Sequence, residues 1–300
     1  MSHDRSRISR FVFAIVMLCA ALAAHAEPLQ FGARTLEIPR PQGFDALSII
    51  SPNQFKLAQA YLPATNRLVE AYILPEDAQA IVAIMAPSMA RYFQLQVIRN
   101  LDGASISESQ FQAGVKEMET EIEQGMKLTQ ELNAQIQKGN ETAERMASKN
   151  PQVALSGTEY LGIYRREPWG LFFTIKVHAS AAGRGDKTIV GSGAIMLANR
   201  QPLLVYGYSR FEAESDRQWT EQAVSAWADA IRGANPDGAV AATAPAAATT
   251  PVARVETAPA PAEANNTGGA ASSALKGGAI GLIVVLIVGL IVRSQRKRGE

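Results

Sequence analysis

The sequence has very little cysteine and histidine. Its one cysteine is Cys19, near the N-terminus, and it holds three histidines in all. If the N-terminal segment is a cleaved signal peptide, the mature chain has no thiol and one histidine, His178. A disulfide and a cysteine nucleophile are then excluded, and a zinc site would lack its usual ligands. We expect no metal and no cofactor.

A strong excess of basic residues and a recognisable catalytic motif are also missing. The net charge is +1, and basic residues cluster towards the two ends, which leaves a mildly acidic central part that is unsuited to nucleic acid. No G-x-S-x-G motif is present, because Gly191-Ser192-Gly193 has a different spacing, so a catalytic triad through His178 has no support. Two carboxylates could still perform acid–base hydrolysis, but the sequence does not indicate which pair.

One long apolar run is present near the C-terminus. Residues 277–292 read GGAIGLIVVLIVGLIV. A bilayer core about 30 Å thick needs roughly 20 residues of helix, which residues 274–292 nearly supply with Lys276 reaching the headgroups. We therefore predict a single transmembrane helix over 274–292 and a basic cytoplasmic tail over 293–300. The charged flanks of this anchor are Lys276, Arg293, Arg296, Lys297 and Arg298.

The same tail has a second interpretation. Gly277-Gly278, an apolar helix and a basic end resemble the C-terminal sorting signals that rhomboid-family proteases read. In that case the helix is removed and the domain leaves the membrane. We favour the stable anchor because the motif is short and Lys276 directly precedes it.

The N-terminus has the features of a secretory signal peptide. Arg5, Arg7 and Arg10 precede an apolar run over residues 11–24, and Ala24-His25-Ala26 forms a cleavage site. We predict a signal peptide over 1–26. Because basic residues remain in the cytoplasm, the part between signal and anchor lies on the outer side of the inner membrane.

Composition divides the remainder into a domain and a tether. Residues 27–233 carry the periodic apolar patterns of one folded domain. Residues 234–273 are rich in Ala, Pro, Thr and Gly without apolar periodicity, so we predict a disordered linker. A coil of about 40 residues spans ~35 Å on average, which leaves the domain free to move above the membrane.

Strand patterns dominate the second half of the domain. Four alternating segments separated by turn residues predict an antiparallel meander with one face on the core. These segments cover 159–165, 171–180, 187–198 and 203–209. Earlier strands are expected over 29–31, 35–38, 67–74 and 91–99, whereas the apolar residues 80–89 fit no single element.

Two amphipathic helices are expected to cover this sheet. Ser107 and Gln110 form a capping box that opens a long helix over 107–138. A closing helix over 214–232 places Trp219, Ala223, Trp227, Ala230 and Ile231 on one stripe, with Gly233 as its C′ residue. A shorter helix is expected over 53–61. The predicted fold class is α+β, an antiparallel sheet covered by helices.

The order of these elements resembles the PsbP-like α+β sandwich. The resemblance is carried by the opening with Pro41, Gly43 and Phe44, the late meander and the terminal helix with its tryptophans. It covers much of residues 48–232 and includes no diagnostic motif. It implies a binding or assembly factor, since that family consists mostly of such proteins.

One exposed turn suggests a contact surface. Trp169 lies at a predicted hairpin tip beside Arg165 and Arg166. A tryptophan on a turn either folds back on the core or contacts a partner. We favour the core and keep partner binding as the alternative.

These observations lead to a hypothesis without an assigned chemistry. The sequence predicts a non-enzymatic, membrane-tethered domain of the bacterial envelope that binds the bilayer through its C-terminal helix and binds or scaffolds an envelope protein. An envelope hydrolase using acidic residues is the alternative.

Overall fold

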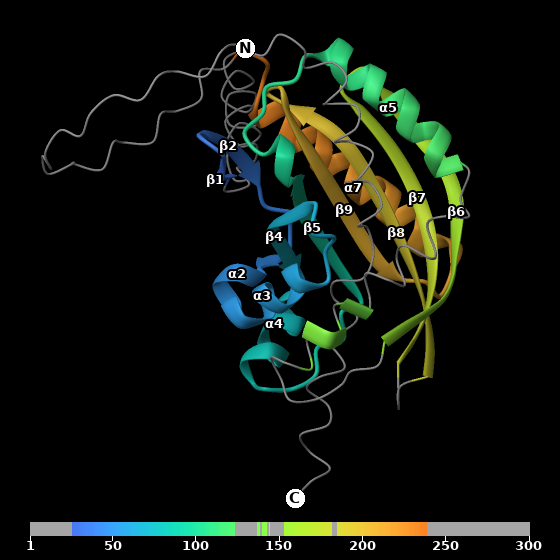
Figure 1. Cartoon of the computed structure of the whole chain (residues 1–300). Coiled ribbons are helices and arrows are strands. Elements are labelled where there is room, and N and C mark those ends of the chain that lie inside the picture. Colours follow the sequence, from blue (N-terminus) through green and yellow to red (C-terminus); the bar gives the residue numbers. More distant parts are fainter. Residues whose placement is uncertain are drawn as a thin grey trace, which may run out of the picture.

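The domain is built on a seven-stranded antiparallel sheet with helices on both faces (Figure 1). The computed structural model describes residues 26–123, 137–138, 140–142, 144, 153–181 and 185–238. The predicted signal peptide except Ala26, most of the linker, the predicted transmembrane helix and the basic tail lie outside these residues. The strands are β1 (Ala26–Phe31), β2 (Arg34–Pro39), β3 (Asp45–Ala46), β4 (Asn66–Ile73), β5 (Arg91–Ile98), β6 (Val153–Glu167), β7 (Gly170–Ala181), β8 (Gly185–Ala198) and β9 (Gln201–Arg210). The helices are α2 (Leu47–Ile50), α3 (Pro52–Ala60), α4 (Pro75–Val82), the 3-10 turn η1 (Arg99–Leu101), α5 (Glu108–Glu123) and α7 (Glu214–Ala234).

The strand order of the large sheet is β3-β4-β5-β9-β8-β7-β6, and β1 pairs with β2 in a separate hairpin. The predicted four-strand meander is confirmed, because β6, β7, β8 and β9 pair consecutively and antiparallel. Asn199 and Arg200 both adopt positive φ, 43° and 65°, in the turn between β8 and β9. Two such residues give the turn the twist that antiparallel strands need.

The expectation that only one face of the meander meets a core is wrong. Along β9, Val205 belongs to the core beneath α7, whereas Leu204, Tyr206 and Tyr208 belong to the core on the opposite face. Because helices cover both sides, nearly every residue of β9 is buried. Polar residues in these strands therefore occupy buried as well as exposed positions, so the alternation located the strands but did not show that both of their faces are covered.

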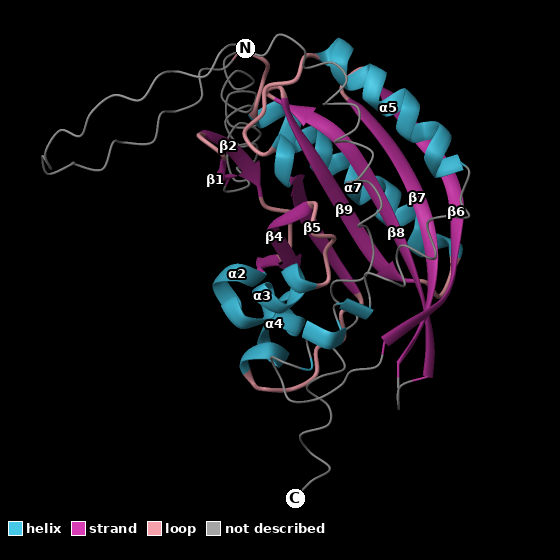
Figure 2. Cartoon of the chain, viewed as in Figure 1, coloured by secondary structure: helices cyan, strands magenta, loops and turns pink. Residues whose placement is uncertain are grey.

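Helix α7 covers one face together with the β1–β2 hairpin (Figure 2). The indole N–H of Trp227 donates to the Pro39 carbonyl at 2.7 Å, which joins this helix to β2. The predicted stripe needs one correction, because Ala230 is exposed and Ala228 is buried in its place.

The predicted end of α7 is also wrong. The helix continues through Gly233, and its C-cap is Asn235. The Asn235 amide accepts from the Glu37 N–H at 2.9 Å and donates to the Glu37 carbonyl at 2.6 Å. Hydrogen bonds to Glu37 on β2 therefore stabilise the end of the helix at Asn235, whereas the sequence predicted that Gly233 would end it.

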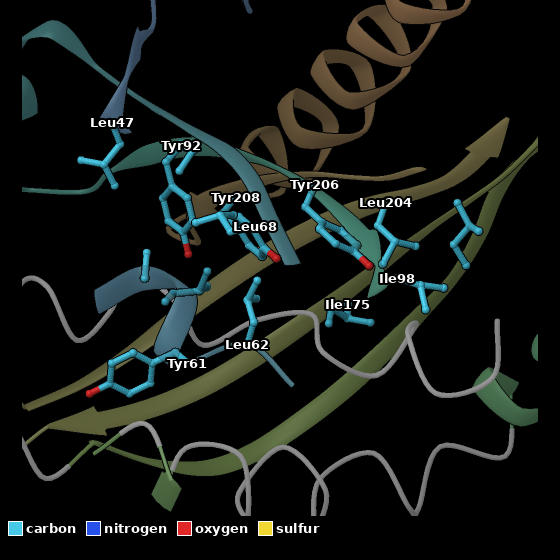
Figure 3. Close-up of a cluster of buried hydrophobic side chains, with 14 of the residues drawn as sticks. Leu47, Tyr61, Leu62, Leu68, Tyr92, Ile98, Ile175, Leu204, Tyr206 and Tyr208 are labelled. Atoms are coloured by element: carbon cyan, nitrogen blue, oxygen red, sulfur yellow. The ribbon is translucent and has the colours of Figure 1, made fainter. Parts of the chain in front are cut away.

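The other face is covered by α2, α3, α4 and α5. Figure 3 shows part of its core, in which Tyr92, Tyr206 and Tyr208 project from β5 and β9. The Tyr92 and Tyr208 rings stack at 4.6 Å. The space for these rings comes from Gly191 and Gly193 on β8, which pair with Tyr208 and Tyr206.

The capping box of the long helix is confirmed. Ser107 Oγ accepts from the Gln110 N–H at 3.3 Å, and Gln110 Oε1 accepts from the Ser107 N–H at 2.9 Å. Helix α5 is described from Glu108 to Glu123, and Phe111 and Val115 bury its inner side. The predicted continuation over residues 124–136 lies outside the described residues.

Candidate functional site

The predicted contact residues lie at the tip of the β6–β7 hairpin. β6 ends at Glu167 and β7 begins at Gly170, so Pro168 and Trp169 form a two-residue turn. The Trp169 ring is half-buried and meets Phe172 edge-on at 5.7 Å. Its carbonyl accepts from the Leu197 N–H at 2.8 Å, which ties the tip to β8. Trp169 therefore closes the end of the sheet and keeps one side exposed.

The two arginines beside this tip point to opposite faces, as neighbours on a strand do. Arg165 donates both terminal nitrogens to Asp229 of α7, each at 2.9 Å. Its guanidinium also lies 4.7 Å from the Phe172 ring centre. The hydrogen bonds to Asp229 raise the pKa of Arg165. This arginine joins the hairpin to α7.

Arg166 points instead towards α5, where it forms an ion pair with Glu119. Its side chain keeps 59% of its surface exposed. The structure therefore separates the two predicted arginines, and Arg166 alone of the pair lines the groove between α5 and the β6–β7 hairpin.

A groove of about 470 Å³ runs between α5 and the β6–β7 hairpin. Its rim is charged and its floor is apolar. Gln112 spans one end by donating to the carbonyls of Glu167, at 3.2 Å, and Pro168. The lining residues are Gln112, Ala113, Val115, Lys116, Glu119, Arg166, Glu167, Gly170 and Leu171.

The groove suits recognition better than acid–base chemistry. Its two carboxylates are each engaged by an arginine, Glu119 by Arg166 and Glu167 by Arg165. Across the described ranges, no three His, Cys, Asp or Glu side chains are placed to hold a metal ion. An apolar floor with paired charges at its rim can hold an apolar side chain and orient the chain that carries it.

The two residues that the sequence analysis weighed for a catalytic triad, His178 and Ser192, lie within hydrogen-bond distance of threonine hydroxyls in the fold. His178 lies on β7 and is exposed, with Nδ1 3.0 Å from Thr188 Oγ1 on β8. Ser192 is buried, and its hydroxyl lies 3.0 Å from Thr174 Oγ1 and 2.8 Å from Thr220 Oγ1. Neither residue contacts the groove. The hydroxyl chain through Ser192 instead links the sheet to α7.

Two buried carboxyl groups were not singled out from the sequence. Glu70 accepts hydrogen bonds from the Ser48 N–H at 3.1 Å and the Ala71 N–H at 2.8 Å. Asp77 accepts from the N–H groups of Ser88 and Met89. Burial raises the pKa of both carboxyls. Each carboxylate accepts hydrogen bonds from backbone N–H groups, and neither lines the groove. No local sequence pattern identifies them, because the burial of a residue depends on the distant segments that pack against it.

The predicted anchor lies outside the described residues, as do its flanks Lys276, Arg293, Arg296, Lys297 and Arg298. No helix in the part of the chain that the structure describes combines the length and apolar character needed to cross a membrane.

Comparison with known proteins finds little. No protein-family model matches the chain, and no curated protein matches its sequence. Among solved structures, the Ran-binding protein Mog1p of Saccharomyces cerevisiae is 11% identical with a TM-score of 0.26, covering 71% of this chain and 93% of that one. A point mutant of Mog1 is 12% identical with a TM-score of 0.27, covering 70% and 92%. At such scores, nothing about the activity or partners of this chain follows.

Proposed function

We propose that this chain is a non-enzymatic binding domain of the bacterial envelope, which holds a segment of a partner protein in the groove between α5 and the β6–β7 hairpin. The observation that carries the proposal is the groove itself, with Val115 and Leu171 in its floor and Lys116, Glu119 and Arg166 around its rim. The rim offers both signs of charge, which would fix the orientation of a bound segment.

The bound segment of the partner would be a loop or the end of a helix rather than a strand that pairs with the edge strand β6. β6 is the edge of the sheet nearest the groove, but its pairing with β7 shifts register at three places. Gly162, at one of these places, has φ +112°. Bulges twist an edge strand away from straight pairing, so an incoming strand would lose hydrogen bonds there. Side chains entering the groove avoid that difficulty.

The tether completes the proposal. The single transmembrane helix over 274–292, the linker over 234–273 and the signal over 1–26 would hold the domain outside the inner membrane within reach of envelope proteins. The resemblance to the PsbP-like sandwich agrees with a binding or assembly role.

Site-specific crosslinking in intact membranes tests the groove. A benzoylphenylalanine at Ala113, a lining residue with an exposed side chain, should form one discrete adduct with an envelope protein. Arg166→Glu should reduce that adduct several-fold, because it places two carboxylates together at the rim. The same crosslinker at the exposed Gln42, on the β2–β3 loop, is the control. An equal adduct from Gln42, or none from Ala113 in folded protein, would contradict the proposal.

A further inference from the structure

The C-terminal end of α4 and the loop that follows it expose a run of apolar residues. Residues 82–86 are all exposed, and Val82, Ile84 and Met85 keep 71%, 56% and 53% of their surfaces in solvent. Ile49 of α2, a helix that contacts α4, is also 71% exposed. No charged residue occurs from 78 to 90. We call residues 82–86 the apolar loop surface.

Ile84 occupies a position where the backbone favours glycine. It has φ +60°, directly after the C-cap Ala83 of α4. The Met85 N–H donates to the Ala80 carbonyl at 2.8 Å, and the Ile84 N–H donates to the Ile81 carbonyl at 3.2 Å. This is the pair of bonds that ends a helix with a left-handed C′ residue, usually glycine. A β-branched side chain is strained there.

Burial of the Ile84 side chain offsets little of the free-energy cost of this backbone conformation. A glycine would end α4 equally well, and the side chain keeps more than half of its surface in water. Strained residues persist where the surrounding structure holds them, and they concentrate at binding sites. Backbone strain combined with exposure is the pattern expected of a residue kept for a contact outside the fold.

The loop is held in shape from within. Asp77 is buried at the start of α4, and its Oδ1 accepts from the Ser88 N–H at 2.6 Å and the Met89 N–H at 3.0 Å. Pro87 and Met89 are buried beneath the loop. With its base fixed by these contacts, the loop presents residues 82–86 outwards in a defined arrangement.

We propose that the apolar loop surface inserts into the lipid interface of the membrane. An aliphatic segment without a charge crosses into the headgroup and acyl boundary without burying an ion. The proposal rests on the proposed tether, which would keep the domain near a bilayer while a linker of about 40 residues would let it turn. Figure 1 places α4 at the opposite end of the sheet from α5, so the groove stays accessible when the loop meets lipid.

A single-cysteine probe tests this contact in the full chain. Cys19 is the only native cysteine, so Cys19→Ser with Ala86→Cys carries one environment-sensitive fluorophore. With excess phosphatidylcholine vesicles, brominated lipid should quench this probe and aqueous iodide should not. The same probe at Arg200→Cys, in the β8–β9 turn, should respond to iodide only.

Ile84→Gly separates a contact role from a structural one. It should lower the equilibrium constant for lipid contact, calculated from the quenched fraction, about tenfold, because one large aliphatic side chain leaves the lipid. It should also raise Tm by about 2–4 °C, because glycine relieves the left-handed strain. Arg200→Gly relieves the same kind of strain at φ 65° and should raise Tm without changing the quenching.

Three results would overturn the proposal. The first is an Ala86 probe that brominated lipid never quenches, and the second is unchanged quenching after Ile84→Gly. The third is a probe shielded without vesicles at rising protein concentration, which would assign the surface to a second copy. Flotation of the chain with the vesicles reports separately on the C-terminal anchor, so failure of the tether and failure of the loop contact are distinguishable.

Discussion

At the residue scale, Glu70 is a buried carboxyl group that hydrogen-bonds to backbone and has a raised pKa. It is 3% exposed, yet it caps the start of α2 by accepting from the Ser48 N–H. Burial is the largest cause of its raised pKa, and the hydrogen bonds from Ser48 and Ala71 oppose it. The folded state therefore binds the Glu70 proton more tightly than the unfolded state does.

This difference predicts how stability changes with pH. The contribution from Glu70 is fully present below its ordinary pKa of 4.5 and is lost as pH rises through the higher pKa of the folded state. Glu70→Gln should remove this loss, because an amide oxygen still accepts from both N–H groups and its nitrogen can donate to the Ser48 hydroxyl. We expect the variant to gain on the order of 1 kcal/mol over wild type between about pH 4.5 and 7.

Urea unfolding of the two proteins across that pH range measures this gain. A stability difference that stays constant with pH would show that Glu70 has the same proton affinity in both states. The lowered pKa of Asp216 acts in the opposite sense, but at lower pH and equally in both proteins.

At the element scale, β8 depends on two glycines for its packing. A Cβ added at Gly193 would lie 2.7 Å from Tyr206 Cε1 and 2.8 Å from Phe173 Cζ. One added at Gly191 would lie 2.9 Å from the Tyr208 ring. These rings cover the bare backbone of β8, which explains the Gly-Ser-Gly sequence without catalysis.

Gly193→Ala should therefore destabilise the domain by about 1–3 kcal/mol, because both contacting rings are buried and cannot move away freely. Gly157→Ala is the matched control on β6, since its nearest neighbour, His178 Cδ2, is 3.7 Å away. Chemical denaturation of both variants decides the point. Equal losses would show that strand glycines matter here through backbone entropy rather than through the tyrosine rings.

At the scale of the whole molecule, the sheet is protected at both edges. β3 at one edge has only two residues, and β6 at the other carries three register shifts. Short or bulged edges discourage pairing with another chain. Both contact sites proposed for the described domain, the groove and the apolar loop surface, are accordingly side-chain surfaces rather than strand edges.

The tether makes its own prediction. We expect the chain to remain in washed membranes, with an intact mass that begins at Glu27 and includes residues 277–300. The physical reason is the transfer free energy of the uninterrupted apolar run over 277–292. A soluble species that ends near Lys276 or Gly277 would instead identify the tail as a sorting signal that a protease removes.

The sequence by itself determined the features that depend on neighbouring residues. Alternation and turn residues located the four strands of the meander, and the pair Ser107 and Gln110 located the start of α5. Such features form through local hydrogen bonds and backbone preferences, so a single sequence is enough to predict them.

Only the tertiary structure decided burial, facing and exposure. It covered both faces of the sheet, ended α7 on Asn235 rather than Gly233, and turned Arg165 and Arg166 to opposite sides. It also buried Asp77 while leaving Ile84 in solvent, although Ile84 is the more apolar of the two. These outcomes depend on segments distant in the chain, since burial belongs to the surface that packs against a residue and not to the residue itself.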